Sequence, residues 1–254
     1  MGIVIVTGAS SGMGREFVKQ ICEHGGVDAV WAVARRKDRL EELQDSLGSV
    51  VVPVECDLTD QQEIKKLADM LAEQKTQVDM LVNCAGFAKF GAYDEINLTD
   101  ALGMIDLDVR ALVYLTQTAL PYMGEGGCVV QIASTAAFQP LPDMNVYAAC
   151  KAFVLSYSRA LNDELQERAI SVTTVCPGWT KTEFFDVAEQ GTSPKAVGNQ
   201  LFMSTPAHVV ASALRAARSH REMCVPGLFN KLHLFFSKII PDSLIMRIWK
   251  MLKG

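Results

Sequence analysis

Three side chains near the middle of the chain have the residue types and the spacing of a proton-transfer site. Tyr147 and Lys151 lie four positions apart in the segment YAACK, and Ser134 lies 13 residues before the tyrosine. Residues i and i+4 share one face of a helix, so the ammonium group would stand beside the phenol. A free phenol has a pKa of about 10, and a neighbouring positive charge favours the phenolate. We therefore predict that Tyr147 exchanges a proton with an alcohol or carbonyl oxygen, and that Ser134 hydrogen-bonds the same oxygen.

Taken alone, these residues have simpler interpretations. Tyr147 and Lys151 also fit an ordinary pair on a helix surface, and Ser134 fits a strand-end or turn residue, with Thr135 beside it. The catalytic interpretation therefore depends on what else the chain places near them.

A glycine-rich turn near the N-terminus predicts a phosphate-binding site. The segment TGASSGMG (7–14) directly follows an apolar run and opens an amphipathic stretch. Many α/β proteins have such a turn for steric reasons, but glycine also lets the backbone approach a pyrophosphate, whose charge a helix N-terminus favours. We expect these turn residues to contact a dinucleotide: Gly8, Ser10, Ser11, Gly12, Met13 and Gly14.

The elements that must position these residues alternate between short apolar strands and amphipathic helices. This alternation predicts an α/β fold, a Rossmann-type doubly wound parallel sheet of about seven strands, in a single domain over 1–254. Strands are predicted over 3–6, 29–34, 50–55, 79–83, 128–133, 170–175 and 223–225. Helices are predicted over 14–24, 38–47, 60–73, 100–123, 147–168 and 206–219.

Composition narrows the class of protein. With 49% hydrophobic and 21% charged residues, the 254-residue chain has ample material for a core, and its net charge of -5 argues against a nucleic-acid partner. The seven cysteines form no CxxC pair and the four histidines are scattered, so we expect free thiols and no metal. Neither a signal peptide nor a membrane-spanning stretch is recognisable, and we expect a cytoplasmic protein.

Further motifs stand where predicted strands end, which is where ligands bind in such sheets. NCAG occupies 83–86 and PGWTKT occupies 177–182, and the glycine turn has the spacing GxxxGxG. Together with Ser134 and YAACK, these motifs closely resemble the short-chain dehydrogenase/reductase family, in the family's order, from residue 3 to about 225.

The resemblance implies roles for individual residues. Ser134, Tyr147 and Lys151 match the catalytic residues, and Lys151 would also contact the nicotinamide ribose. Asp57 matches a residue that hydrogen-bonds the adenine, although a helix-capping role is the alternative, and Asn83 matches one that mainly steadies the central strands. The remaining positions expected at the cofactor are Leu58, Ala85, Gly86, Pro177, Gly178, Thr180 and Thr182.

One position departs from the family. Asp108 stands where an asparagine is usual, whose backbone carbonyl is thought to hold a water beside the catalytic lysine. The added carboxylate should pair with Lys151 and raise the pKa of Tyr147, which predicts an alkaline optimum for alcohol oxidation. A solvated or helix-capping Asp108 is the alternative.

The end of the second predicted strand suggests which nicotinamide cofactor is used. An NAD-specific site needs an acid there, but the position holds Ala34, and Arg35 follows it. A guanidinium can hold the 2′-phosphate, so we predict NADP(H) rather than NAD(H). The alternative is that Arg35, Arg36, Lys37 and Arg39 form a solvated charge run.

Two segments are expected to shape the substrate site. The region 183–205 is predicted to be a lid, or a segment packed on itself, with these apolar residues: Phe184, Phe185, Val187, Leu201, Phe202 and Met203. The extension 226–254 carries five Lys and Arg residues against one Asp, and one face of its last helix holds Leu244, Ile245, Ile248, Trp249 and Leu252. A flap or subunit contact, a membrane-surface anchor and plain core packing all fit this extension.

The predicted function is hydride transfer between NADP(H) and a carbonyl or secondary alcohol of a lipophilic small molecule, such as a ketone, steroid-like or acyl substrate. Enoyl reduction is disfavoured, because relatives that carry it out tend to have a wider Tyr-to-Lys spacing. A non-catalytic NADP(H)-binding sensor or scaffold is the alternative from another class. The resemblance also suggests a homodimer or homotetramer.

Overall fold

The computed structural model describes residues 2–74, 76–189 and 203–253, with side chains as far as Met251. Seven strands form one parallel sheet in the order β3-β2-β1-β4-β5-β6-β7. The predicted Rossmann-type fold is therefore confirmed. The direction in which successive strands are added to the sheet reverses between β1 and β4, which is where such folds bind dinucleotides. The strands are β1 (Ile3–Thr7), β2 (Ala29–Ala34), β3 (Val51–Glu55), β4 (Val78–Asn83), β5 (Cys128–Ile132), β6 (Ser171–Val175) and β7 (Met223–Cys224).

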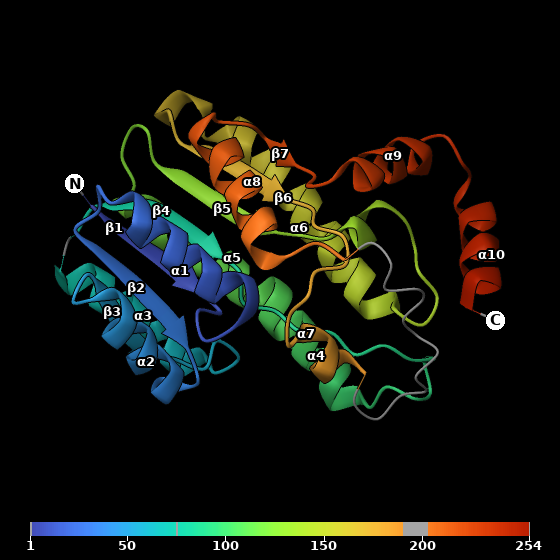
Figure 1. The fold of residues 1–254 in the computed structure, drawn as a ribbon, viewed down its shortest axis with the longest axis horizontal. Helices are drawn as coiled ribbons and strands as arrows, with labels where there is room; N and C mark the ends of the chain where they lie inside the picture. Colours follow the sequence, from blue (N-terminus) through green and yellow to red (C-terminus); the bar gives the residue numbers. More distant parts are fainter. Residues whose placement is uncertain (1, 75, 190–202, 254) are drawn as a thin grey trace.

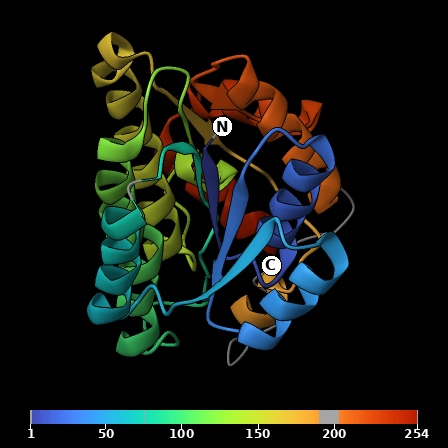
Figure 2. The same ribbon diagram turned by 90° about the vertical axis from the view of Figure 1, so that its left-hand side faces the viewer.

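Helices cover both faces of the sheet (Figure 1), and the view turned by 90° shows the twisted sheet between the two layers (Figure 2). One layer consists of α1 (Gly12–His24), α2 (Lys37–Leu47) and α8 (Pro206–Arg218). The other consists of α3 (Gln61–Gln74), α4 (Leu98–Ile105), α5 (Leu112–Ala119) and α6 (Asn145–Glu164).

The central strands are apolar throughout because both faces of the sheet are covered. All five residues of β1 are buried. Successive side chains point to opposite faces, so Val4 and Val6 pack in one cluster with Phe17 of α1. Ile5 joins the cluster on the other face with Leu67 of α3.

The helix predicted over 100–123 is continuous, but it is not a uniform α-helix. The chain forms α4, then a π-helical segment at Asp106–Ala111, then α5, and ends in a 3₁₀ turn at Leu120–Tyr122. Asn97 begins α4, because its side chain accepts the backbone N–H of Asp100 at 2.8 Å. A π-helical turn inserts one extra residue into the helix, which changes the direction of the side chains within it.

After β6 the chain forms the short α7 (Phe184–Ala188), and after β7 it forms α9 (Leu228–Ser237) and α10 (Asp242–Lys253). The predicted lid residues Leu201 and Phe202 lie outside the described residues. α9 and α10 lie at the end of the molecule opposite to the N-terminus (Figure 1). None of the described helices is long and apolar enough to cross a bilayer.

Candidate active site

The phosphate turn lies between β1 and α1. Gly8 and Gly12 have φ angles of 68° and 53°, left-handed values that favour glycine. Thr7 joins the turn to the next strand in the sheet, because its hydroxyl accepts two backbone N–H groups just after β4, at 2.9 and 3.0 Å. The first turn of α1 lines a large cavity, where its free backbone N–H groups suit a phosphate.

The three predicted proton-transfer residues meet at the carboxyl end of β5. Tyr147 and Lys151 lie one turn apart near the start of α6, and only 7% and 5% of them is exposed, so they are not a surface pair. The ammonium nitrogen of Lys151 lies 5.6 Å from the centroid of the Tyr147 ring and donates to the carbonyl oxygen of Ile132 at 3.2 Å. The Ser134 hydroxyl accepts the backbone N–H of Ala136 at 3.1 Å and hydrogen-bonds Tyr147.

Burial and charge act in opposite directions on the Tyr147 phenol. Burial raises its pKa, because the phenolate would lose its hydration. The ammonium group of Lys151 and the hydrogen bond from Ser134 both lower the same pKa, whereas the carboxylate of Asp108 raises it. The pKa of Tyr147 is raised overall, and these two neighbours offset part of the effect of burial.

A buried carboxylate lies next to Lys151. Asp108, which is 1% exposed, places Oδ2 3.4 Å from Lys151 Nζ, while its Oδ1 accepts the backbone N–H of Phe87 at 3.2 Å. A Cβ at Gly86 would lie 2.6 Å from Oδ1, so this arrangement requires the glycine. Burial raises the pKa of Asp108, whereas Lys151 lowers it. The alternative of a solvated Asp108 is wrong.

Two arginines follow β2 beside the phosphate turn. Arg36 donates from Nε and Nη2 to the hydroxyl of Ser10 at 3.2 and 3.0 Å, and from Nη1 to Glu183 at 3.0 Å. The more exposed Arg35 places Nη1 3.9 Å from a carboxylate oxygen of Asp57. Arg36 therefore links the phosphate turn to the start of the predicted lid segment, and Arg35 lies next to the predicted adenine site.

A single cavity of about 1100 Å³ connects the phosphate turn to Ser134, Tyr147 and Lys151. It is also lined by Gly8, Ser10, Ser11, Gly12, Met13, Gly14, Arg35, Asp57, Leu58, Ala85, Gly86, Pro177, Gly178, Thr180 and Thr182. Asn83 is the exception among the predicted site residues. Its buried amide nitrogen donates to Thr116 at 3.0 Å and to Gln131 at 3.1 Å, so its side chain joins β4 to α5 and β5.

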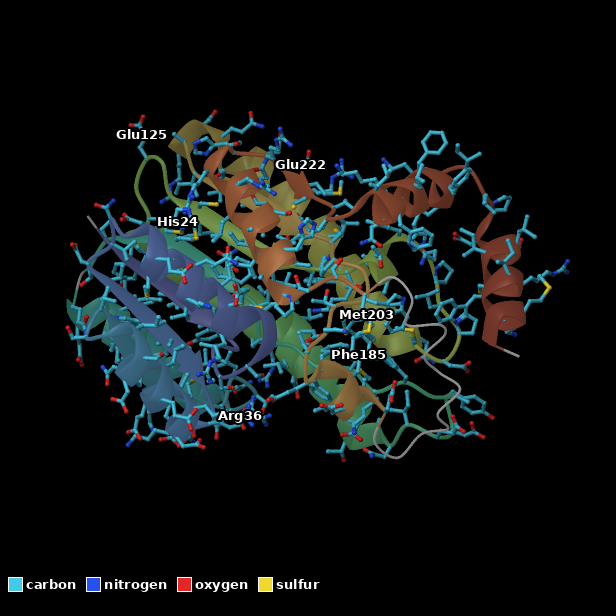
Figure 3. All side chains as sticks on the ribbon, in the orientation of Figure 1. His24, Arg36, Glu125, Phe185, Met203 and Glu222 are labelled. Atoms are coloured by element: carbon cyan, nitrogen blue, oxygen red, sulfur yellow. The ribbon has the colours of Figure 1, made fainter. Side chains whose placement is uncertain are left out.

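Aromatic side chains line the cavity beside Tyr147. The ring centroid of Phe90 lies 6.0 Å from that of Tyr147 and 6.4 Å from that of Phe184. The rings of Trp179 and Phe185 lie 5.2 Å apart and extend this wall. Figure 3 shows Phe185 and Met203 near the centre of the view, between the sheet and α10.

The C-terminal extension supplies the far wall of the cavity. Trp249 of α10 donates from Nε1 to the carbonyl oxygen of Pro142 at 3.0 Å and packs against the cluster that contains Tyr147. His233 of α9 lies 6.0 Å from the ring of Phe138, and burial lowers its pKa. The extension lines the cavity with Phe229, Asn230, His233, Phe236, Ser237, Ile240, Ile245, Ile248 and Trp249.

Several of these site residues are not singled out by the sequence. Arg36 belongs to a run of charges that also fits a solvated surface, and its position one residue after Arg35 is the only signal. Phe90 lies four residues after NCAG and Trp249 lies far beyond any motif, and only the fold brings both side chains to the cavity. The apolar face of the last helix was a signal for Trp249, but it did not say which surface that face covers.

Comparison with known proteins identifies the family of the chain. The family model described as short chain dehydrogenase matches residues 2–192. The NADP-dependent 3-hydroxy acid dehydrogenase of Escherichia coli (strain K12) is 36% identical over 198 residues, 76% of this chain and 79% of that protein. The serine 3-dehydrogenase of Rhizobium radiobacter is 35% identical over 185 residues, 72% of this chain and 74% of the relative.

Solved structures show the same fold. A short-chain dehydrogenase from Sphingobium yanoikuyae in complex with NADPH superposes with a TM-score of 0.79 at 27% identity, covering 96% of this chain and 98% of that one. A closed form of serine dehydrogenase complexed with NADP+ has a TM-score of 0.77 at 31% identity, covering 88% and 93%.

The fold and the site define an oxidoreductase that acts on hydroxyl or carbonyl groups with a nicotinamide dinucleotide. The chain belongs to the short-chain dehydrogenase family.

Proposed function

We propose that this protein transfers a hydride reversibly between NADP(H) and the carbonyl or secondary alcohol group of a lipophilic small molecule. A single observation carries the proposal: one cavity joins a phosphate turn, two arginines and the buried Tyr147–Lys151 pair to a wall of aromatic side chains. A ketone of steroid-like or acyl type suits this cavity better than a small polar acid.

The residues at the end of β2 fit a dinucleotide with a 2′-phosphate. A Cβ on Gly8 would lie 2.9 Å from the Cα of Ala85, so the turn packs this closely against the segment after β4 only with glycine at this position. Ala34 offers no carboxylate for ribose hydroxyls, whereas Arg35 and Arg36 offer two guanidinium groups at the cavity edge. We therefore assign NADP(H), a choice that the NADP-dependent relatives support.

Residues of the chain itself transfer the proton. The bound cofactor supplies or accepts the hydride. In reduction, the Tyr147 hydroxyl gives its proton to the substrate oxygen, and Lys151 stabilises the phenolate that remains. Ser134 donates a hydrogen bond to the same oxygen as negative charge develops on it. Burial of all three side chains strengthens these interactions, because little water is left to screen them.

The substrate class is inferred from the wall opposite the phosphate turn. Phe90, Phe184 and Trp249 lie close around Tyr147 and favour apolar, bulky groups next to the reacting carbon. The relatives named above act on 3-hydroxy acids and on serine. We propose that the aromatic wall and the C-terminal extension adapt the same chemistry to a lipophilic substrate.

A turnover assay tests this function. The purified protein is mixed with NADPH and a panel of bulky lipophilic ketones, with short 3-oxo acids as the polar comparison, and the loss of NADPH absorbance is followed. We expect a higher kcat/KM for the bulky ketones. If wild type binds NADPH but, like Tyr147→Phe, turns over no member of the panel, this result would instead support a sensor or scaffold.

We also propose that the protein is a cytoplasmic homodimer or homotetramer. All seven cysteines are free thiols, which suits a reducing compartment. Tyr114 on α5 and Phe153 on α6 are exposed aromatic side chains on one helical layer and suit a subunit contact. Light scattering coupled to size-exclusion chromatography tests this, and a monomer at micromolar concentration would contradict it.

A further inference from the structure

The C-terminal helices carry an unusual share of the exposed apolar side chains. Nine of the sixteen large hydrophobic residues that are exposed in the described chain lie between residues 228 and 251: Leu228, Phe229, Leu232, Phe235, Phe236, Ile239, Leu244, Ile248 and Met251. Apolar patches of this kind mark interaction surfaces rather than random exposure.

α9 has two apolar stripes that serve different surfaces. The cavity-facing stripe consists of Phe229, His233, Phe236 and Ile240. The second stripe, which we call the outer stripe of α9, lies one position earlier at Leu228, Leu232, Phe235 and Ile239, and all four residues are exposed and outside the cavity lining. Each residue advances a helix by about 100°, so the two stripes face directions roughly a quarter-turn apart. Ile239 continues the helical turn, because its N–H donates to the carbonyl of Phe236 at 3.0 Å.

α10 repeats this arrangement. Ile245, Ile248 and Trp249 line the cavity, and an outer stripe of α10 is formed by Leu244, Ile248 and Met251, which are exposed. Ile248 lies at the border of the two stripes. The outer stripe of α9, and Leu244 and Met251 of α10, are therefore not needed to close the substrate cavity.

Cations flank both outer stripes on the side away from the cavity. At 100° per residue, Lys231 and Lys238 lie beside the outer stripe of α9, and Arg247 lies beside that of α10 with Lys250 further round the same side. All four are exposed. Residues 226–254 hold five of the 24 Lys and Arg residues but one of the 29 Asp and Glu residues, so this extension is basic on an otherwise acidic protein.

We propose that the outer stripes of α9 and α10 dock on an anionic phospholipid surface. Exposed Phe, Leu and Ile side chains next to a row of Lys and Arg are the composition of helices that lie in the membrane interface. Anionic headgroups supply the counter-charge that these four cations need. A second copy of this chain paired face to face would instead bring two sets of cations together, which costs free energy.

Flotation of the full-length protein with vesicles tests this docking surface. We expect wild type to float with vesicles of phosphatidylcholine and phosphatidylglycerol, and not with vesicles of phosphatidylcholine alone. Phe235→Asp/Ile239→Asp, which changes two exposed residues outside the cavity lining, should abolish flotation. Lys231→Gln/Lys238→Gln should weaken binding about fivefold for each removed charge, and salt should weaken wild-type binding.

Tyr93→Asp is the matched control, because Tyr93 is a large side chain, 85% exposed, outside the extension, and this variant should float like wild type. Circular dichroism and melting temperature show whether each variant is folded. Failure of wild type to float with anionic vesicles would overturn the proposal, as would wild-type flotation of Phe235→Asp/Ile239→Asp. Wild type could instead float with neither kind of vesicle while Phe235→Asp/Ile239→Asp reduces the oligomer size in light scattering. In that case the outer stripes form a contact between copies of the chain, and the proposal is wrong.

Discussion

Asp108 offers the sharpest test of the site. Its carboxylate lies beside Lys151 and should control the pH at which the Tyr147–Lys151 pair loses its first proton. Asp108→Asn removes the charge and nearly conserves the shape. The amide oxygen can still accept the N–H of Phe87, which lies 3.2 Å from Oδ1 in the native site. Both the lysine and the carboxylate are buried, so little water screens their interaction.

The magnitude follows from the distance. Two unit charges 3.4 Å apart attract each other by about 5 kcal/mol at an effective dielectric constant of about 20. This attraction favours the form of the pair that keeps both protons, and the same carboxylate raises the pKa of Tyr147 directly. In Asp108→Asn both effects vanish, so the first proton leaves at lower pH. Each 1.4 kcal/mol or so of lost attraction corresponds to about a tenfold change in that equilibrium.

The assay is the pH dependence of kcat and kcat/KM for oxidation of a secondary alcohol at saturating NADP+. We expect the rising limb of the wild-type profile to lie on the alkaline side, and that of Asp108→Asn to move toward neutral pH. Two thiols near the lysine do not interfere below pH 10, because burial raises the pKa of Cys84 to about 12 and that of Cys150 to about 11.

Asp106→Asn is the matched control, because Asp106 lies on the same π-helical segment, is 42% exposed at its side chain and pairs with Arg110 at 3.0 Å. Its profile should match that of wild type. Superimposable profiles for wild type and Asp108→Asn would refute the reasoning and mean that the buried carboxyl is neutral over this range. An equal shift in Asp106→Asn would point to a change of the helix rather than to the buried charge.

Three further predictions concern the rest of the site. Tyr147→Phe should lower kcat by several powers of ten, about 1.4 kcal/mol of barrier for each tenfold, while NADPH binding measured by fluorescence persists; near-full activity would exclude Tyr147 as the acid. Arg35→Ala should weaken NADPH binding about 10- to 100-fold and leave NADH binding nearly unchanged, whereas an equal loss for both cofactors would show that Arg35 does not contact the 2′-phosphate. Trp249→Ala should raise KM for a bulky ketone more than for a small one, since it removes a residue of the cavity wall and the hydrogen bond to Pro142. An unchanged ratio of the two KM values would exclude α10 from substrate binding.

The parts that sequence predicts well are those that depend on local pattern. β1 and β2 are short apolar runs buried on both faces, so their bounds follow from composition. The helix predicted over 100–123 is present, but the π-helical turn within it was not predicted. The segment has helical periodicity throughout, and nothing local marks the π-helical turn that carries Asp108, whose carboxylate contacts Lys151. The position of Arg36 against Ser10 and Glu183 likewise depends on segments that are far apart in the chain.

The C-terminal extension shows where inference from family resemblance stops. The family model ends its match at residue 192, before α9 and α10 begin. The apolar face recognised in the last helix is consistent with a flap, an interface or an anchor, because periodicity alone does not say what an apolar face covers. The structure separates two faces, since one stripe of α9 lines the cavity and the other is exposed beside Lys231 and Lys238. The proposed proton transfer thus depends on residues within the motifs of the family, whereas the proposed substrate class and docking surface depend largely on side chains outside those motifs.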